Sequence, residues 1–142
     1  MKKQEITTCA FIYNTKRQLF IPKRAKNKQF FPDKFELIGG HVEFGESLQE
    51  ALMREVQEEL GLAVTIENPY YAFTYVLADG ETHAVEVNYF ARFVDPDPQI
   101  ILHSEDHSDF AWISENQVNH YFDPDDNEKI AVLEGFHYLK MK

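Results

Sequence analysis

Alternating apolar and polar positions along the chain predict a protein built largely of short β-strands. The pattern places two strands at residues 6–13 and 18–21, joined by a polar turn, and a short third strand at residues 35–38. The turn signal Asp79-Gly80 favours a hairpin later in the chain. The remaining segments with strand-like patterns are residues 62–66, 70–77, 83–93 and 110–113.

Capping signals predict three helices. Ser47 and Glu50 have the S-x-x-E spacing of a capping box, and Gly61 stands where a glycine commonly ends a helix. Two further helices are expected near the C-terminus, with caps at Ser114 and Asp125, each followed three residues later by Gln or Glu. Strands with helices between and after them predict a mixed α/β sandwich. The length of 142 residues, without an internal repeat or linker, favours a single domain over residues 1–142.

The first predicted helix carries an unusual arrangement of charge. On a helical wheel its leucine, valine and methionine side chains form an apolar stripe, and Glu55, Glu58 and Glu59 form a second stripe directly beside it. A solvated acidic face would lie opposite the apolar stripe, whereas these like charges crowd its edge and repel one another. A divalent cation such as Mg²⁺ would offset the repulsion. An ion pair between Arg54 and Glu58 is the structural alternative, and the spacing leaves both open.

Composition and charge narrow the class of protein. The chain is 44% hydrophobic and has no apolar run long enough to span a bilayer, so neither a disordered protein nor a membrane protein is expected. A net charge of −10 disfavours binding to nucleic acid, although residues 1–34 carry +7 and the remainder −17. An anionic substrate could bind between these regions if a metal ion covered the acidic one. The single cysteine excludes an internal disulfide, and a cytoplasmic protein is expected.

A longer motif surrounds the three glutamates. Gly40 is followed after five residues by Glu46, and after seven more by the run Arg54-Glu55-Val56-Gln57-Glu58-Glu59-Leu60-Gly61-Leu62. This arrangement matches the pattern G-x5-E-x7-R-E-U-x-E-E-x-G-U, with U aliphatic, at every defined position, and the chain therefore resembles the Nudix hydrolase family. The order of predicted elements also resembles the Nudix α/β/α sandwich with a mixed β-sheet. The chain has isoleucine where many members have proline before the two glycines.

The resemblance implies hydrolysis of a nucleoside diphosphate linked to another moiety, with Mg²⁺ or Mn²⁺ as the cofactor. Glu58 and Glu59 would be metal ligands, together with the carbonyl oxygen of Gly39. Glu55 would either bind metal or deprotonate the attacking water, and Arg54 would orient the glutamates. Metal ions suit this chemistry because they neutralise phosphate charge, activate water and stabilise a leaving pyrophosphate.

Residues 20–25 and 122–128 resemble the corresponding segments of MutT-type members of the family, which clear oxidised guanine nucleotides. By position, Arg24 would contact sugar or phosphate, and Asn127 would read an edge of the base. Capping of the last helix explains Asn127 equally well. The same resemblance implies a nucleotide pocket lined by Glu36, Leu37, Ile38 and Gly39.

Several further residues have two interpretations. Glu105, in an acidic loop, is expected as another metal ligand or as the base, with a plain solvated loop as the alternative. We interpret three aromatic residues as anchors of the core or of loops, and not as surfaces on which a base stacks: Phe30, Phe31 and Trp112. Cys9 is expected inside a core strand.

Three functions follow from these features. The first is a metal-dependent pyrophosphohydrolase that cleaves (deoxy)nucleoside triphosphates, with oxidised ones as candidates, to monophosphate and pyrophosphate. The second is hydrolysis of ADP-ribose or another nucleoside diphosphate sugar, and the third is a non-catalytic Nudix-fold binding module. The complete set of glutamates disfavours the third. The expected partner is a small-molecule nucleotide, with no nucleic acid or membrane, bound to a monomer or a homodimer.

Overall fold

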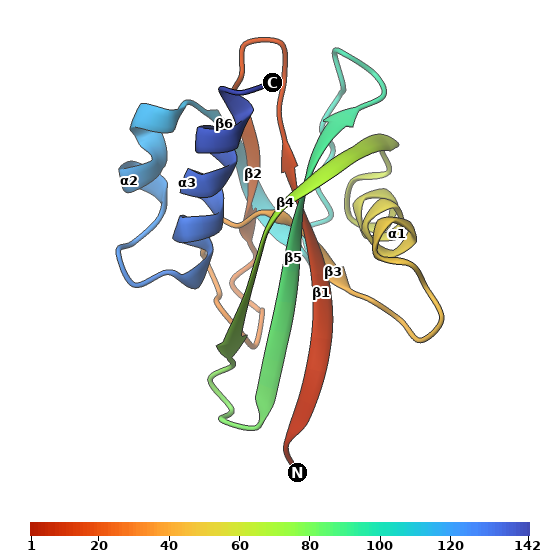
Figure 1. Ribbon diagram of the computed structural model, residues 1–142, viewed down its shortest axis with the longest axis vertical. Coiled ribbons are helices and arrows are strands. Elements are labelled where there is room, and N and C mark those ends of the chain that lie inside the picture. Colours follow the sequence, from red (N-terminus) through yellow and green to blue (C-terminus); the bar gives the residue numbers. More distant parts are fainter.

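A four-stranded mixed sheet forms the centre of the computed structural model, which describes residues 1–142 (Figure 1). Its strands lie in the order β3-β1-β5-β4, with β1 parallel to β5 and both outer pairs antiparallel. Strands β2 and β6 form a separate antiparallel pair. The strands are β1 (Lys3–Ile12), β2 (Leu19–Arg24), β3 (Ile38–His41), β4 (Val64–Val76), β5 (Thr82–Phe93) and β6 (His107–Ile113).

Helices cover both sides of this sheet, which confirms the predicted α/β sandwich (Figure 1). Helix α1 (Leu48–Leu60) packs on one face, and α2 (Val118–Tyr121) and α3 (Asn127–Leu139) lie on the other. A 3₁₀ turn, η1 (Glu115–Gln117), leads into α2. No helix in the structure is both long and apolar enough to cross a bilayer.

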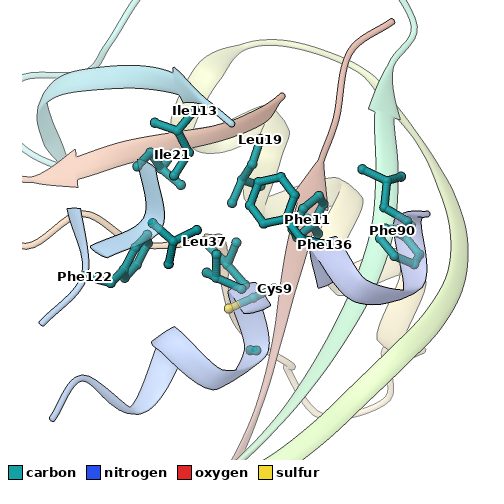
Figure 2. Packing of buried hydrophobic residues seen from close by; sticks show 13 residues of the cluster. Cys9, Phe11, Leu19, Ile21, Leu37, Phe90, Ile113, Phe122 and Phe136 are labelled. Atoms are coloured by element: carbon teal, nitrogen blue, oxygen red, sulfur yellow. The ribbon is translucent and has the colours of Figure 1, made fainter. Parts of the chain in front are cut away.

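The alternation of side chains along β1 creates two cores, one for each helical layer. Cys9 and Phe11 point toward α3, and Figure 2 shows them in a cluster with Phe90 and Phe136. Ala10 and Ile12, which point to the opposite face, pack instead against α1, together with Leu52, Val56 and Leu60. Because the two faces of one strand serve two cores, β1 fixes the position of α1 relative to α3.

The predicted helix ends are confirmed for α1 and shifted for α3. The Ser47 hydroxyl accepts a hydrogen bond from the Glu50 amide at 3.1 Å, and Gly61 ends α1 in the left-handed region with φ of 66°. At α3 the cap is Asp126, not the predicted Asp125, because the Asp126 carboxylate accepts from the Glu128 amide at 2.9 Å.

Predicted strand boundaries were wrong in several places, for instance at β1 and β6, which begin three residues earlier than expected. The strands predicted at residues 62–66 and 70–77 are one edge strand, β4 (Val64–Val76), whose pairing with β5 shifts register around Pro69 because proline cannot donate to the ladder. The third strand begins at Ile38 instead of ending there. Its two glycines, residues that often end a strand, lie inside β3. Glycine is required at position 39 because a Cβ there would collide with the backbone of Thr8 on the paired strand β1.

Candidate active site

Arg54 on α1 donates hydrogen bonds to three carboxylates, and a fourth, that of Glu43, lies 3.8 Å from its Nη1. Its Nε and Nη2 donate to the two oxygens of Glu46 at 2.8 and 2.9 Å. Its Nη1 lies 3.0 Å from Glu55 Oε1 and 3.2 Å from Glu58 Oε2. The Arg54 hydrogen bond holds the pKa of Glu46 at about 2, well below its usual range. Its Nη2 also donates to the carbonyl of His41, at 3.0 Å, and so ties α1 to β3. Arg54 therefore holds Glu55 and Glu58 of α1 in place.

Glu59 lies outside the reach of this guanidinium. Its Oε2 is buried without a hydrogen-bond partner, and its Oε1 is 3.8 Å from Nε2 of His107. Burial raises the pKa of Glu59 to about 9, and the charges of Glu36 and Glu55 contribute to the increase. A buried carboxylate of this kind requires either a proton or a cation.

The ion-pair alternative for α1 thus accounts for only part of the acidic stripe. Arg54 compensates Glu58 one helical turn away, as expected, but leaves Glu59 uncompensated. Donor atoms of Glu59, Glu36 and His107 all lie within 4.8 Å of one another. The carboxylate oxygens of Glu36 and Glu59 are hard ligands, and Glu59 Oε2 is buried without a hydrogen-bond partner, so this cluster suits a cation such as Mg²⁺.

The two glycines of β3 lie between Glu55 of α1 and a large cavity. A Cβ on Gly40 would collide with the Glu55 carboxylate, so only glycine lets this side chain reach β3. Gly39 and Gly40 also line a cavity of about 450 Å³, a size typical of small-molecule sites. The β3 backbone at Gly40 therefore lies between the Glu55 carboxylate and the cavity.

The cavity lies between the sheet face that points toward α3, the segment around residues 30–37 and the beginning of α3. Of the predicted nucleotide-contacting residues, five line it: Arg24, Glu36, Leu37, Gly39 and Asn127. Ile38 does not, because its buried side chain faces α1 on the other side of the sheet. The cavity has aromatic walls, formed by Phe30, Phe31, Phe35, Phe73 and Tyr75.

Arg24 is already engaged within the protein. Its Nε donates to the carbonyl of Phe30 at 2.9 Å, and its Nη1 lies 3.2 Å from Glu36 Oε1. The other Glu36 oxygen is 2.8 Å from Nε2 of His107, the residue that approaches Glu59. A polar chain therefore runs from the cavity wall to the buried glutamate of α1.

His107 is the site residue that sequence reasoning did not identify. It is 1% exposed at the start of β6, and its Nδ1 has no hydrogen-bond partner. Glu105, two residues earlier, is exposed and makes no hydrogen bond or ion pair, while its neighbour Asp106 pairs with Lys28 at 2.9 Å. A histidine in an otherwise ordinary strand carries no sequence signal, because its role depends on carboxylates distant in the chain.

The aromatic residues divide into two groups. Trp112 packs against Phe20 and Phe93, as expected of a core anchor. Phe30 and Phe31 were expected to anchor core or loop, but they line the cavity, and Phe31 is 46% exposed. Their side chains are available to a ligand.

Comparison with known proteins agrees with this geometry. The sequence model of the NUDIX domain matches residues 3–133. The chain belongs to the NUDIX family. Nucleoside triphosphatase NudI of Enterobacter sp. (strain 638) is 32% identical over 126 residues, covering 82% of this chain and 86% of that protein. NudI of Escherichia coli O139:H28 is 31% identical over 125 residues, covering 84% of this chain and 88% of that protein.

Solved structures show the same NUDIX fold. The MutT protein of Methanosarcina mazei Go1 superimposes with a TM-score of 0.82 at 23% identity, covering 99% of this chain and 98% of that chain. A MutT NUDIX hydrolase of Burkholderia pseudomallei gives a TM-score of 0.75 at 21% identity, covering 94% and 98%. The architecture of strands and helices is therefore that of the NUDIX family over nearly the whole chain.

Proposed function

We propose that this protein is a metal-dependent pyrophosphohydrolase that converts (deoxy)nucleoside triphosphates to monophosphate and pyrophosphate. The observation that carries the proposal is the position of Glu55 of α1 against Gly40, a glycine that also lines the 450 Å³ cavity. The similarity to enzymes named nucleoside triphosphatase supports the class of substrate.

By the family resemblance, Mg²⁺ or Mn²⁺ would be held by Glu58, Glu59 and the carbonyl oxygen of Gly39. The structure supports Glu59, and it adds Glu36, whose carboxylate lies close to that of Glu59. A bound metal would neutralise phosphate charge and lower the pKa of a coordinated water. Glu55 is the residue best placed to bind metal or to accept the water's proton, because Arg54 fixes it beside Gly40. Glu105 is less suited to either role, because its side chain is exposed and belongs to neither cluster of metal-ligating groups.

The cavity suits the rest of the nucleotide. Its aromatic walls can stack on a base, and the β3 end can receive the phosphates next to the glutamates. Lys3, Lys34 and Arg24 line the cavity and can contact phosphate oxygens. Acidic side chains also line it, among them Glu5, Glu36 and Asp126, so a metal ion is needed to offset their repulsion of the phosphates.

Hydrolysis in ¹⁸O-labelled water with Mg²⁺ tests the proposed function. We expect monophosphate and pyrophosphate, with label in one of them and no diphosphate intermediate, because pyrophosphate leaves readily only when metal covers its charge. Mass spectrometry of the products, with each triphosphate and ADP-ribose in parallel, checks this expectation. Accumulation of diphosphate and orthophosphate would contradict it, and turnover of ADP-ribose alone would show a nucleoside diphosphate sugar hydrolase.

Arg24→Ala is expected to raise KM by about tenfold, with a smaller change in kcat. The guanidinium can bind phosphate in a bidentate manner, and it also holds Glu36 and the Phe30 carbonyl at the cavity wall. Steady-state kinetics of Arg24→Ala beside Lys26→Ala, an exposed lysine in the next turn, measure the effect. Unchanged kinetics for several nucleotides would show that Arg24 does not contact substrate.

A further inference from the structure

The outer side of α3 is an apolar surface that the rest of the chain leaves uncovered. Figure 1 shows α3 on the outside of the sandwich, with α2 beside it. Of the twelve large hydrophobic residues that are exposed in this structure, four lie on α3 or in the turn that follows it: Ile130, Leu133, Tyr138 and Met141. Ile130 is 57% exposed and Met141 is 69% exposed. These four residues form the α3 outer face.

Helical periodicity separates the outer face from the side of α3 that packs on the sheet. At about 100° per residue, Ile130 lies between Leu133 and Tyr138 on one side of the helical wheel. The buried residues of α3 form the other side: Ala131, Val132, Gly135, Phe136 and Leu139. The outer side of a surface helix is normally polar, and a helix that is apolar on both sides is normally buried on both. The composition of α3 is therefore that of a helix with a partner on its outer face.

The charges at the two ends of α3 indicate which partner fits. Asp123, Asp125 and Asp126 precede the helix, whereas Lys140 and Lys142 follow it. The ion pairs that Asp123 and Lys140 form within one chain leave both side chains more than half exposed, so a second copy can reach them. A second α3 in antiparallel orientation would bring the acidic end of each copy to the basic end of the other, and the helix dipoles would also be aligned favourably.

An antiparallel pair related by a two-fold axis also matches the apolar contacts. Ile130 and Met141 lie at opposite ends of the outer face, so Ile130 of each copy would lie over Met141 of the other. His137, which is exposed near the middle of the outer face, would lie close to the axis. A two-fold interface uses the same surface on both copies, and one helix face can therefore supply both halves of it.

We propose that the α3 outer face is the interface of a homodimer in which two α3 helices pack antiparallel about a two-fold axis. The inference does not depend on the proposed function. A contact between two helices is small beside the roughly 800 Å² per partner of a standard interface, so we expect a dissociation constant in the micromolar range.

Sedimentation velocity over a range of micromolar concentrations tests the dimer. The wild-type protein should change from monomer to dimer as its concentration increases. Ile130→Glu should raise the dissociation constant by at least about a hundredfold, because each dimer would then bury two unpaired charges. Val94→Glu introduces the same charge at another exposed hydrophobic residue, outside α3, and should preserve the wild-type equilibrium. Circular dichroism and thermal unfolding verify that both variants are folded.

Cross-linking with a short bismaleimide tests the antiparallel arrangement. His137→Cys places a thiol near the proposed axis, so two copies should be cross-linked efficiently. Ile130→Cys places its two thiols about 16 Å apart along the helix axis, and cross-linking should be lost. The native Cys9 is buried and should not react.

Several results would overturn the inference and leave the proposed function intact. One is a wild-type protein that stays monomeric throughout. If this monomer bound phosphatidylcholine vesicles and Ile130→Glu abolished the binding, the outer face would contact a membrane surface instead. A dimer unaffected by Ile130→Glu would show that the copies associate through another surface. Cross-linking of Ile130→Cys without cross-linking of His137→Cys would contradict the antiparallel arrangement.

Discussion

Glu59→Gln is expected to lower kcat by at least about a hundredfold while the protein remains folded. Glutamine keeps the shape of the side chain but removes the charge that a divalent cation needs. The structure makes this position more sensitive than its neighbours, because Glu59 is the carboxylate of the acidic stripe that no arginine compensates. Steady-state kinetics over a range of Mg²⁺ concentrations measure the effect.

The matched control for this variant is Glu50→Gln, an exposed glutamate in the first turn of the same helix. It should retain wild-type kinetics, because its side chain makes no ion pair and does not line the cavity. Circular dichroism and thermal unfolding establish that both variants are folded. Full activity of folded Glu59→Gln at saturating Mg²⁺ would contradict the metal-binding role.

The metal-free protein is expected to lose stability as the pH rises from about 5 to 9. The pKa of Glu59 rises from an ordinary value of 4.5 to about 9 in the folded state, mainly through burial. A carboxyl group with a raised folded pKa contributes stability that is complete below the unfolded pKa and lost as pH increases toward the folded pKa. Glu86 and Glu128 shift in the same direction, also through burial. Together they should lower the free energy of unfolding by several kcal/mol.

Urea unfolding in EDTA at several pH values measures this loss, and the same series with Mg²⁺ measures its reversal. Mg²⁺ should stabilise the protein more at pH 9 than at pH 5, because binding requires ionised carboxylates. Glu59→Gln should have a flatter pH dependence and little stabilisation by Mg²⁺, whereas Glu50→Gln should behave as wild type. A metal-free wild-type protein whose stability rises between pH 5 and 9 would contradict the assignment.

Local sequence patterns were most informative around α1. The cap at Ser47, the end at Gly61 and the acidic stripe beside the apolar one all depend on residues within a few positions of each other. The same is true of the ion pair from Arg54 to Glu58. Patterns were less reliable where a long-range contact decides the outcome, as in β3. There Gly39 is required by the close approach of β1, and Gly40 by the carboxylate of Glu55 on α1.

The NUDIX family, the alternation of strands and helices, and the glutamates expected to hold metal can all be predicted from residue types at short, fixed spacings. How the charges of these groups are compensated depends on the tertiary structure. It left Glu59 without an arginine, placed His107 beside it and turned Ile38 away from the cavity. It also brought Glu86 and Glu128, 42 positions apart in the chain, to one cavity. Burial and charge proximity set the pKa of a carboxyl group, and both arise only when distant strands and helices pack together.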